Sequence, residues 1–114
     1  MLEKRKHKRI NNHIPIRYKK LSAPQAAEST TITKDLCGGG FLFRTEAFIS
    51  MACRLIIELE IPLFDRPIKA IAKVAWIKKT ASGKSFEVGN QILDMSKEDK
   101  QLFFEYINTL FIDE

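Results

Sequence analysis

Residues 29–44 of the chain read STTITKDLCGGGFLFR, with a strand-like segment on either side of a run of glycines. The segment 29–36 is rich in β-branched residues, which favour strands. At 37–40, CGGG marks a place where the backbone turns sharply or approaches another group closely, because glycine accepts dihedral angles that other residues avoid. FLFR at 41–44 then resumes an apolar alternation. This stretch predicts a β-hairpin.

Strand-like segments also lie before and after this hairpin. HIPIRYKK at 13–20 alternates, with Ile14, Ile16 and Tyr18 on one face, which is the period of a half-buried strand. Three more strand-like runs follow the hairpin, at 53–61, 68–78 and 84–93. PLFDRP and TASG, which separate these runs, contain turn-forming residues. Short strands joined by turns predict a β-barrel or a sandwich.

The last part of the chain has a helical pattern instead. Ser96 and Asp99 have the S-x-x-D spacing of a helix N-cap. The apolar residues that follow recur on one helical face: Leu102, Phe103, Tyr106, Ile107, Leu110 and Phe111. The sequence therefore predicts a C-terminal helix over 96–112, and we expect its apolar face to pack against the barrel or to close one end of it.

Length and composition limit the possible classes of protein. With 114 residues, of which 45% are hydrophobic, the chain fits one globular domain, 1–114. Cys37 and Cys53 form no CxxC pair and have no metal-ligand spacing, so neither a disulfide framework nor a metal site is expected in a reducing cytosol. The most apolar stretch, LIIELEIPLF, is too short to span a membrane and includes Glu58 and Glu60. No nucleophile–base pair or Walker-type loop points to an enzyme.

The positive charge of the chain is concentrated near its start. The formal net charge is +5, and residues 1–20 hold eight Lys or Arg against one acid, whereas the remaining residues hold eleven bases and thirteen acids. RKHKR places Arg5 and Arg9 four positions apart. A solvated tail, a clamp for an anionic ligand and a non-specific nucleic-acid contact all fit this cluster. The body of the chain, however, has no basic stripe with interleaved aromatic residues that would favour nucleic acid.

A second motif gives this charge cluster a specific interpretation. Asp35, Cys37 and Gly40 form the pattern D-x-C-x-x-G, downstream of the R-x-x-x-R pattern at 5–9. Together with the later segments AKVAWIKK and EVGNQILDMSKED, this pairing resembles the PilZ family, bacterial domains that bind cyclic di-GMP. The pattern of that family is R-x-x-x-R followed by [D/N]-x-S-x-x-G. The resemblance covers nearly the whole chain.

The resemblance implies a fold and a ligand. The implied fold is mainly β, a six-stranded antiparallel barrel over 13–94 with a C-terminal α-helix at 96–112. Residues 1–12 are expected to form a mobile arginine segment in front of the barrel. The implied ligand is cyclic di-GMP, as one molecule or as a stacked pair, with no cofactor and no metal.

Four residues match the binding motifs of the family, and a fifth, Cys37, departs from them. Arg5 and Arg9 supply planar guanidinium groups that can bind a phosphate or the O6/N7 edge of guanine. Asp35 can accept hydrogen bonds from guanine N1–H and N2–H₂, and Gly40 lets the backbone approach the ligand. Cys37 stands where the family has Ser, and its thiol is a weaker donor than a hydroxyl.

Three further residues are expected near the ligand. Lys4 directly precedes Arg5, at a position that in this family bears on whether one ligand or a stacked pair is held. Gly39 is an extra glycine of the turn and adds flexibility there. For Trp76, a core position with one edge near the ligand is preferred over direct stacking on a base.

The sequence thus predicts a cyclic di-GMP receptor or effector module of the bacterial cytoplasm. Ligand binding is expected to order the arginine segment over the nucleotide, and an unidentified effector protein then reads this change. The alternative is a PilZ-like protein-interaction adapter with weak or no nucleotide binding, for which Cys37 is the one supporting feature. Neither a specific nucleic acid nor an enzymatic reaction is expected.

Overall fold

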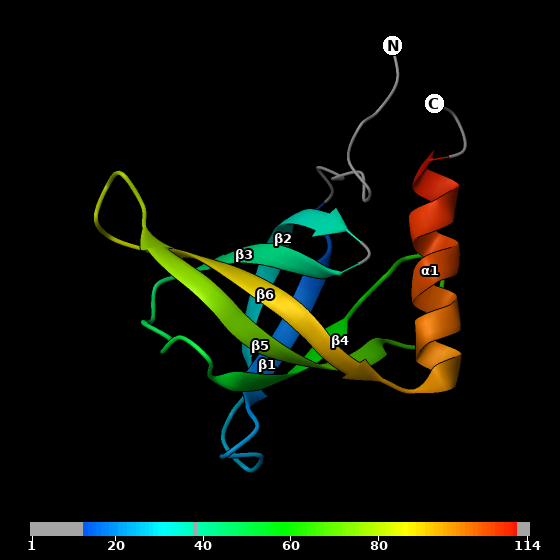
Figure 1. Cartoon of the computed structure of the whole chain (residues 1–114), viewed down its shortest axis with the longest axis horizontal. Coiled ribbons are helices and arrows are strands. Elements are labelled where there is room, and N and C mark those ends of the chain that lie inside the picture. Colours follow the sequence, from blue (N-terminus) through cyan, green and yellow to red (C-terminus); the bar gives the residue numbers. More distant parts are fainter. Residues whose placement is uncertain (1–12, 38, 112–114) are drawn as a thin grey trace.

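Within the described residues, 13–37 and 39–111, six strands close into a barrel and one helix follows them (Figure 1). The structure is a computed structural model. The elements are β1 Pro15–Lys20, β2 Ser29–Cys37, β3 Gly40–Thr45, β4 Arg54–Leu59, β5 Ile68–Lys79, β6 Phe86–Met95 and α1 Lys97–Phe111. All neighbouring strands are antiparallel, in the order β1-β2-β3-β6-β5-β4. The predicted six-stranded antiparallel barrel with a C-terminal helix is confirmed.

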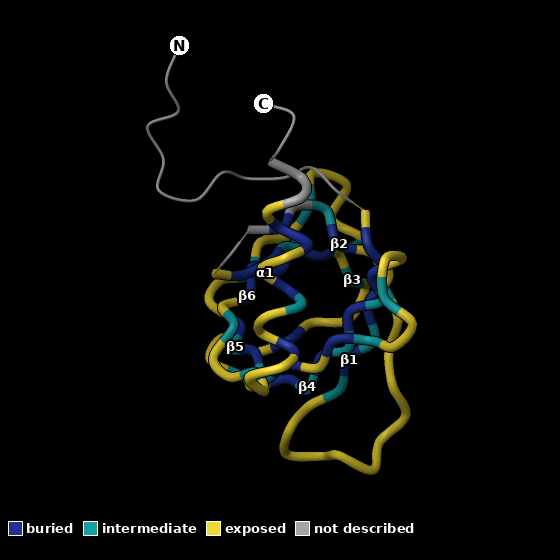
Figure 2. The backbone as a smooth tube through the Cα atoms, turned by 90° about the vertical axis from the view of Figure 1, so that its right-hand side faces the viewer, coloured by how far each residue is buried: buried dark blue, intermediate teal, exposed yellow. Residues whose placement is uncertain are grey.

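Alternating apolar residues of the strands fill the inside of the barrel. Ile14, Ile16 and Tyr18 are buried, as the sequence predicts for one face of this segment, and Figure 2 shows buried and exposed positions alternating along the strands. The ring of Tyr18 stacks on that of Phe43, with the centroids 4.8 Å apart. Because each fully buried side chain of this kind contributes about 1.5–3 kcal/mol, these inward rows stabilise the barrel.

A capping hydroxyl and a buried carboxylate fix the start of α1. The Asp99 amide donates to Ser96 Oγ at 3.1 Å, which confirms the predicted N-cap. The Asp99 carboxylate accepts the Lys69 amide at 2.9 Å and forms an ion pair with Arg66 at 2.6 Å. Burial opposes the charge of this carboxylate, but these two partners outweigh burial and hold the pKa of Asp99 below its ordinary value. The helix is thereby tied to β5 and to the segment just before it.

One face of α1 belongs to the barrel core. Phe103, Tyr106 and Ile107 are buried in the same hydrophobic cluster as the strand residues, so the expected packing of this face is confirmed. Leu110 and Phe111 complete the predicted face, but their side chains lie outside the described part of the structure. Among the described residues, no helix has both the length and the apolar character that are needed to cross a bilayer.

Candidate functional site

A β-bulge interrupts the pairing of β2 with β3 just before the glycine turn. Thr33 pairs with Phe43, whereas Asp35 pairs with Leu42, so Lys34 is an extra residue in β2. Thr33 and Phe43 are buried, while Leu42 is half-buried between two buried phenylalanines and lies on the outer face. A bulge shifts the alternation of inward and outward residues by one position. The backbone of Asp35 therefore pairs with Leu42, a residue of the outer face.

A second bulge has the same effect in β5. Val74 is buried and pairs with Asn90, whereas Trp76 pairs with Gly89, so Ala75 is an extra residue. Strict alternation would place Trp76 on the same face as Val74, in line with the core position expected for it. The bulge instead turns Trp76 outward, where it is 43% exposed. The core interpretation of Trp76 is therefore wrong, and its ring is accessible to a ligand.

The two bulges together align one row of paired residues across four strands. Asp35 of β2 pairs with Leu42 of β3, and Leu42 pairs with Gly89 of β6. Gly89 in turn pairs with Trp76 of β5. We call these four residues the outer row. Bulges frequently adjoin binding sites because they redirect side chains, and here they bring the motif acid and the single tryptophan into one line.

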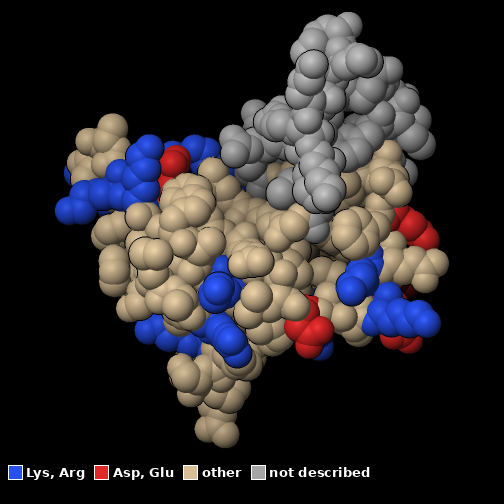
Figure 3. All heavy atoms as spheres, viewed as in Figure 1, with Lys and Arg blue, Asp and Glu red and all other residues tan. Residues whose placement is uncertain are grey.

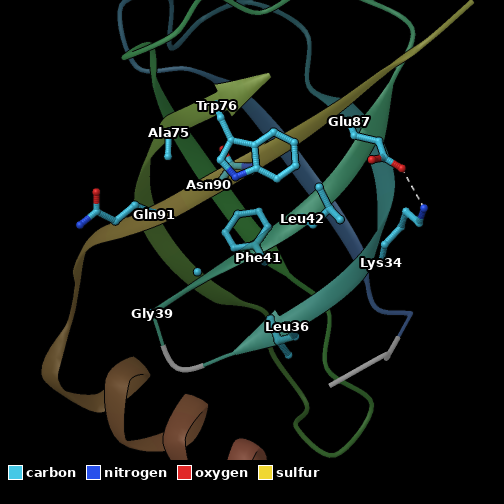
Figure 4. A pocket seen from close by; sticks show the side chains of 12 residues that line it. Lys34, Leu36, Gly39, Phe41, Leu42, Ala75, Trp76, Glu87, Asn90 and Gln91 are labelled. Atoms are coloured by element: carbon cyan, nitrogen blue, oxygen red, sulfur yellow. Dashed lines mark hydrogen bonds and ion pairs between the residues drawn. The ribbon is translucent and has the colours of Figure 1, made fainter. Parts of the chain in front are cut away.

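A pocket of about 590 Å³ opens over the outer row (Figure 4). Its wall includes Lys34, Gly39, Gly40, Trp76, Glu87 and Gln91. Figure 4 shows the indole of Trp76 on one side of the pocket and the paired side chains of Lys34 and Glu87 on another. Pockets that hold small ligands commonly measure about 300–1,000 Å³, so this one has room for a nucleotide-sized molecule.

Two glycines allow close approach at this pocket. A Cβ at Gly89 would overlap the indole of Trp76, so the ring lies directly on the glycine backbone. A Cβ at Gly40 would overlap the backbone oxygen of Asn90 on β6. At Gly39, by contrast, no atom lies within 4 Å of where a Cβ would be. The packing of the pocket therefore requires glycine at positions 40 and 89 but not at position 39.

Charged side chains border the same pocket. Lys34 Nζ donates to Glu87 Oε2 at 2.9 Å, and Arg44 Nη2 donates to the same oxygen at 3.2 Å. The hydrogen bond from Lys34, followed by that from Arg44, holds the pKa of Glu87 below its ordinary value. The β5–β6 hairpin carries three further exposed lysines: Lys78, Lys79 and Lys84. Figure 3 shows basic side chains gathered where this hairpin protrudes, so the surroundings of the pocket favour an anion.

The predicted site residues fall into three groups. Three lie outside the described residues: Lys4, Arg5 and Arg9. Two are described in their backbone but not in their side chains: Asp35 and Cys37. Three line the pocket together: Gly39, Gly40 and Trp76. The structure therefore brings the glycine turn and the tryptophan to one place.

Sequence reasoning did not place most of the pocket residues in the site, and three of these omissions bear on the function: Lys34, Glu87 and Gly89. Gly89 carried a usable signal, because a single glycine inside a strand pattern marks a bulge or a close approach of another group. Lys34 and Glu87 are 53 positions apart, and only the strand register brings them together. Within the described residues, no group of three His, Cys, Asp or Glu side chains could hold a metal ion.

Comparison with known proteins identifies both a family and related folds. A family model for the PilZ domain matches residues 3–109. The structure of the Bacillus subtilis inhibitor of motility (MotI/DgrA) is similar, with a TM-score of 0.79 and 14% identity over 99% of this chain. The chain spans only about half of that protein, 54% of its length.

Two further similar structures were solved with cyclic di-GMP. The PilZ domain of YcgR from Escherichia coli has a TM-score of 0.70 and 14% identity, and the match covers 97% of this chain and 94% of that domain. The MrkH complex from K. pneumonia has a TM-score of 0.70 and 13% identity, with 98% of this chain and 53% of MrkH covered. At these identities the likeness shows the fold. No curated protein matches the sequence.

Proposed function

The chain belongs to the PilZ domain family, and from this premise we propose that it is a receptor module that binds cyclic di-GMP in the pocket over the outer row. The position of the pocket carries the proposal. It adjoins the D-x-C-x-x-G motif and contains Gly40 together with the exposed ring of Trp76. Cyclic di-GMP carries two phosphates, which suit the lysines around the pocket, and two guanines, which suit the ring of Trp76.

Each motif residue has a proposed role in binding. Arg5 and Arg9 bind phosphate or the guanine O6/N7 edge through their planar guanidinium groups. Asp35 accepts from guanine N1–H and N2–H₂. Gly40 permits the close packing of β3 on β6 that shapes the edge of the pocket. Cys37, in the family's serine position, is a weaker donor and lowers the affinity by up to about tenfold relative to serine.

The remaining candidates act around these residues. Lys4 adds a positive charge beside the arginines and influences whether one ligand or a stacked pair is held. Trp76 stacks on a guanine, since its ring is exposed within the pocket. Gly39 contributes its backbone at the turn, where a side chain would also fit.

Signalling is proposed to follow from closure of the arginine segment. Binding orders residues 1–12 over the nucleotide, which changes one surface of the molecule, and a partner protein of the bacterial cytoplasm reads this surface. The concentration of positive charge in residues 1–20 supports this step. Amide hydrogen exchange tests it, because protection of residues 1–10 and 35–40 should rise on binding while α1 changes little.

Calorimetric titration with cyclic di-GMP tests the proposed function, with cyclic di-AMP as the ligand control. We expect Arg9→Ala or Asp35→Ala to weaken binding by about 1–3 kcal/mol, the value of a good bidentate contact to a base. Arg54→Ala is the matched control, because Arg54 is an exposed arginine on β4 and does not line the pocket. If Arg9→Ala and Asp35→Ala bind like the parent, the site lies elsewhere.

Cys37 favours one alternative, a PilZ-like adapter that contacts a partner protein without the nucleotide. The same titration separates the two functions. A parent protein that binds neither cyclic dinucleotide, and a Cys37→Ser variant that binds cyclic di-GMP, would favour the adapter. We propose no enzymatic activity, because the proposed role of the pocket is to bind a ligand and not to transform it.

A further inference from the structure

Lys34 occupies an unusual position in the wall of the pocket. It is the extra residue of the β2 bulge and directly precedes Asp35 of the motif. Its side chain lines the pocket, and Nζ lies 2.9 Å from Oε2 of Glu87, which lines the pocket too (Figure 4). A basic group at this place can reach an anionic ligand as well as its present partner.

The ion pair between Lys34 and Glu87 is easily exchanged. Both side chains are partly exposed, at 39% and 22%, and ion pairs of this kind contribute little to stability. Lys34 has three N–H donors on a flexible stem, so a small rotation redirects it. Phosphate oxygens accept from an ammonium group as readily as a carboxylate does.

Glu87 does not lose all its partners when Lys34 turns away. Arg44 Nη2 remains 3.2 Å from the same oxygen of Glu87, and Arg44 does not line the pocket. Lys78, which is exposed, also pairs with Glu87 in the strand register. The carboxylate therefore stays beside positive charge, and releasing Lys34 leaves no isolated anion on the wall.

We propose that Lys34 is a further ligand-binding residue of this pocket, which donates to a phosphate of the ligand, and that Glu87 is a positioning residue that competes with this phosphate for Lys34. This inference rests on the proposed function, with cyclic di-GMP as the ligand. The Glu87 carboxylate lowers the affinity for the ligand, because Lys34 must leave it to reach the phosphate. How strongly Glu87 competes depends on how firmly Arg44 holds the same carboxylate in the free protein.

Calorimetric titration of the full chain with cyclic di-GMP tests the proposal. Lys34→Gln weakens binding by about tenfold, the usual value of a charge-assisted hydrogen bond. Glu87→Gln tightens binding by up to about fivefold, because an exposed competing ion pair is removed. Lys34→Arg keeps a charged donor and binds more tightly than Lys34→Gln. The matched control is Lys20→Gln, an exposed lysine on β1 outside the pocket, which changes affinity by less than about twofold.

A double variant separates competition from general charge effects. In the Lys34→Gln background, Glu87→Gln no longer tightens binding, because nothing is left to compete for. If Glu87→Gln tightens binding equally in both backgrounds, the effect is long-range electrostatics, and the proposed competition for Lys34 is refuted. If the parent binds and Lys34→Gln matches Lys20→Gln, this inference fails while the proposed function stands. If the parent shows no binding, the proposed function fails and this inference fails with it.

Discussion

Of two charge clusters on opposite walls of the barrel, one has more carboxylates than cations and the other has more cations than carboxylates. On the wall of β1 and β4, the guanidinium of Arg17 is surrounded by three carboxylates. They belong to Glu58 and Glu60, each 2.8 Å away, and to Glu28, 3.8 Å away. On the wall of the pocket, Lys34 and Arg44 share the single carboxylate of Glu87. One cluster has excess negative charge and the other excess positive charge.

The two walls also differ in the regularity of their strand pairing. The pairings of β1 with β2, β1 with β4 and β4 with β5 run without a register shift. The pairings of β2 with β3 and of β5 with β6 contain the bulges beside the outer row. The glycines that the structure describes also lie on this side, at positions 39, 40, 83 and 89. We call the wall of β1 and β4 the regular wall and the wall of β2, β3, β6 and β5 the bulged wall. The regular wall stabilises the barrel, whereas the bulged wall is shaped to leave a pocket.

The largest effect is expected where the bulged wall relies on a glycine. Gly40→Ala places a Cβ against the backbone oxygen of Asn90, which cannot move without shifting β6. We expect the free energy of unfolding to fall by about 1–3 kcal/mol, as in other overpacked sites. Gly39→Ala is the control, since its Cβ meets open space and should change stability by less than about 0.5 kcal/mol. Equal denaturant midpoints for the two variants would contradict the account.

A second prediction concerns the ring that rests on Gly89. Gly89→Ala displaces the indole of Trp76, and binding of cyclic di-GMP falls by about tenfold or more, because stacking on a base is worth about 1–3 kcal/mol. Trp76→Ala causes a loss of similar size. The double variant should bind no worse than Trp76→Ala alone, since the added Cβ then has no ring to displace. A further loss in the double variant would show that Gly89 acts through the backbone and not through Trp76.

The two charge clusters predict opposite effects on stability and on ligand affinity when one cation is removed from each. Arg17→Gln leaves three carboxylates without their shared partner, so the denaturant midpoint should fall while ligand affinity stays within about twofold. Lys34→Gln should leave the midpoint nearly unchanged and weaken binding. Parallel titrations and unfolding curves measure both. A loss of affinity in Arg17→Gln would mean that the two walls do not have separate roles.

The smallest effect depends on pH. Hydrogen bonds from Lys34 and then Arg44 lower the pKa of Glu87 from its ordinary value of 4.5. The ionised carboxylate therefore stabilises the fold above pH 4.5, and this stabilisation is lost as the pH falls through the lowered pKa. At pH 7, Glu87→Gln should reduce the free energy of unfolding by about 0.5 kcal/mol, because the pair is partly exposed. The difference from the parent should vanish in acid. A constant difference from pH 7 to pH 3 would contradict this.

The regular wall was more predictable from sequence than the bulged wall. The alternation of Ile14, Ile16 and Tyr18 identified their buried face correctly, because no bulge interrupts β1. For the helix, Ser96 and Asp99 are close in sequence, and the capping hydrogen bond joins these two residues. Patterns of this kind need no knowledge of distant parts of the chain.

Trp76 and the Lys34–Glu87 pair show what the sequence could not reveal. One extra residue in β5, Ala75, reverses the face of Trp76, and no local pattern distinguishes a bulge from regular pairing there. Lys34 and Glu87 come together only because β2, β3 and β6 lie side by side in a particular register. The motif glycine at 40 could be recognised, but its reason, the closeness of Asn90 on another strand, required the structure.

Mapping the ligand onto the two walls tests the central claim most directly. In a ¹H–¹⁵N correlation spectrum recorded during titration with cyclic di-GMP, the single indole N–H of Trp76 and the amides of Gly40 and Gly89 should shift and saturate together. The amide signals of Arg17 and Glu58, on the opposite wall, should keep their chemical shifts. Saturable shifts centred on Arg17 and Glu58, with Trp76 unmoved, would contradict the assignment of the bulged wall as the binding face.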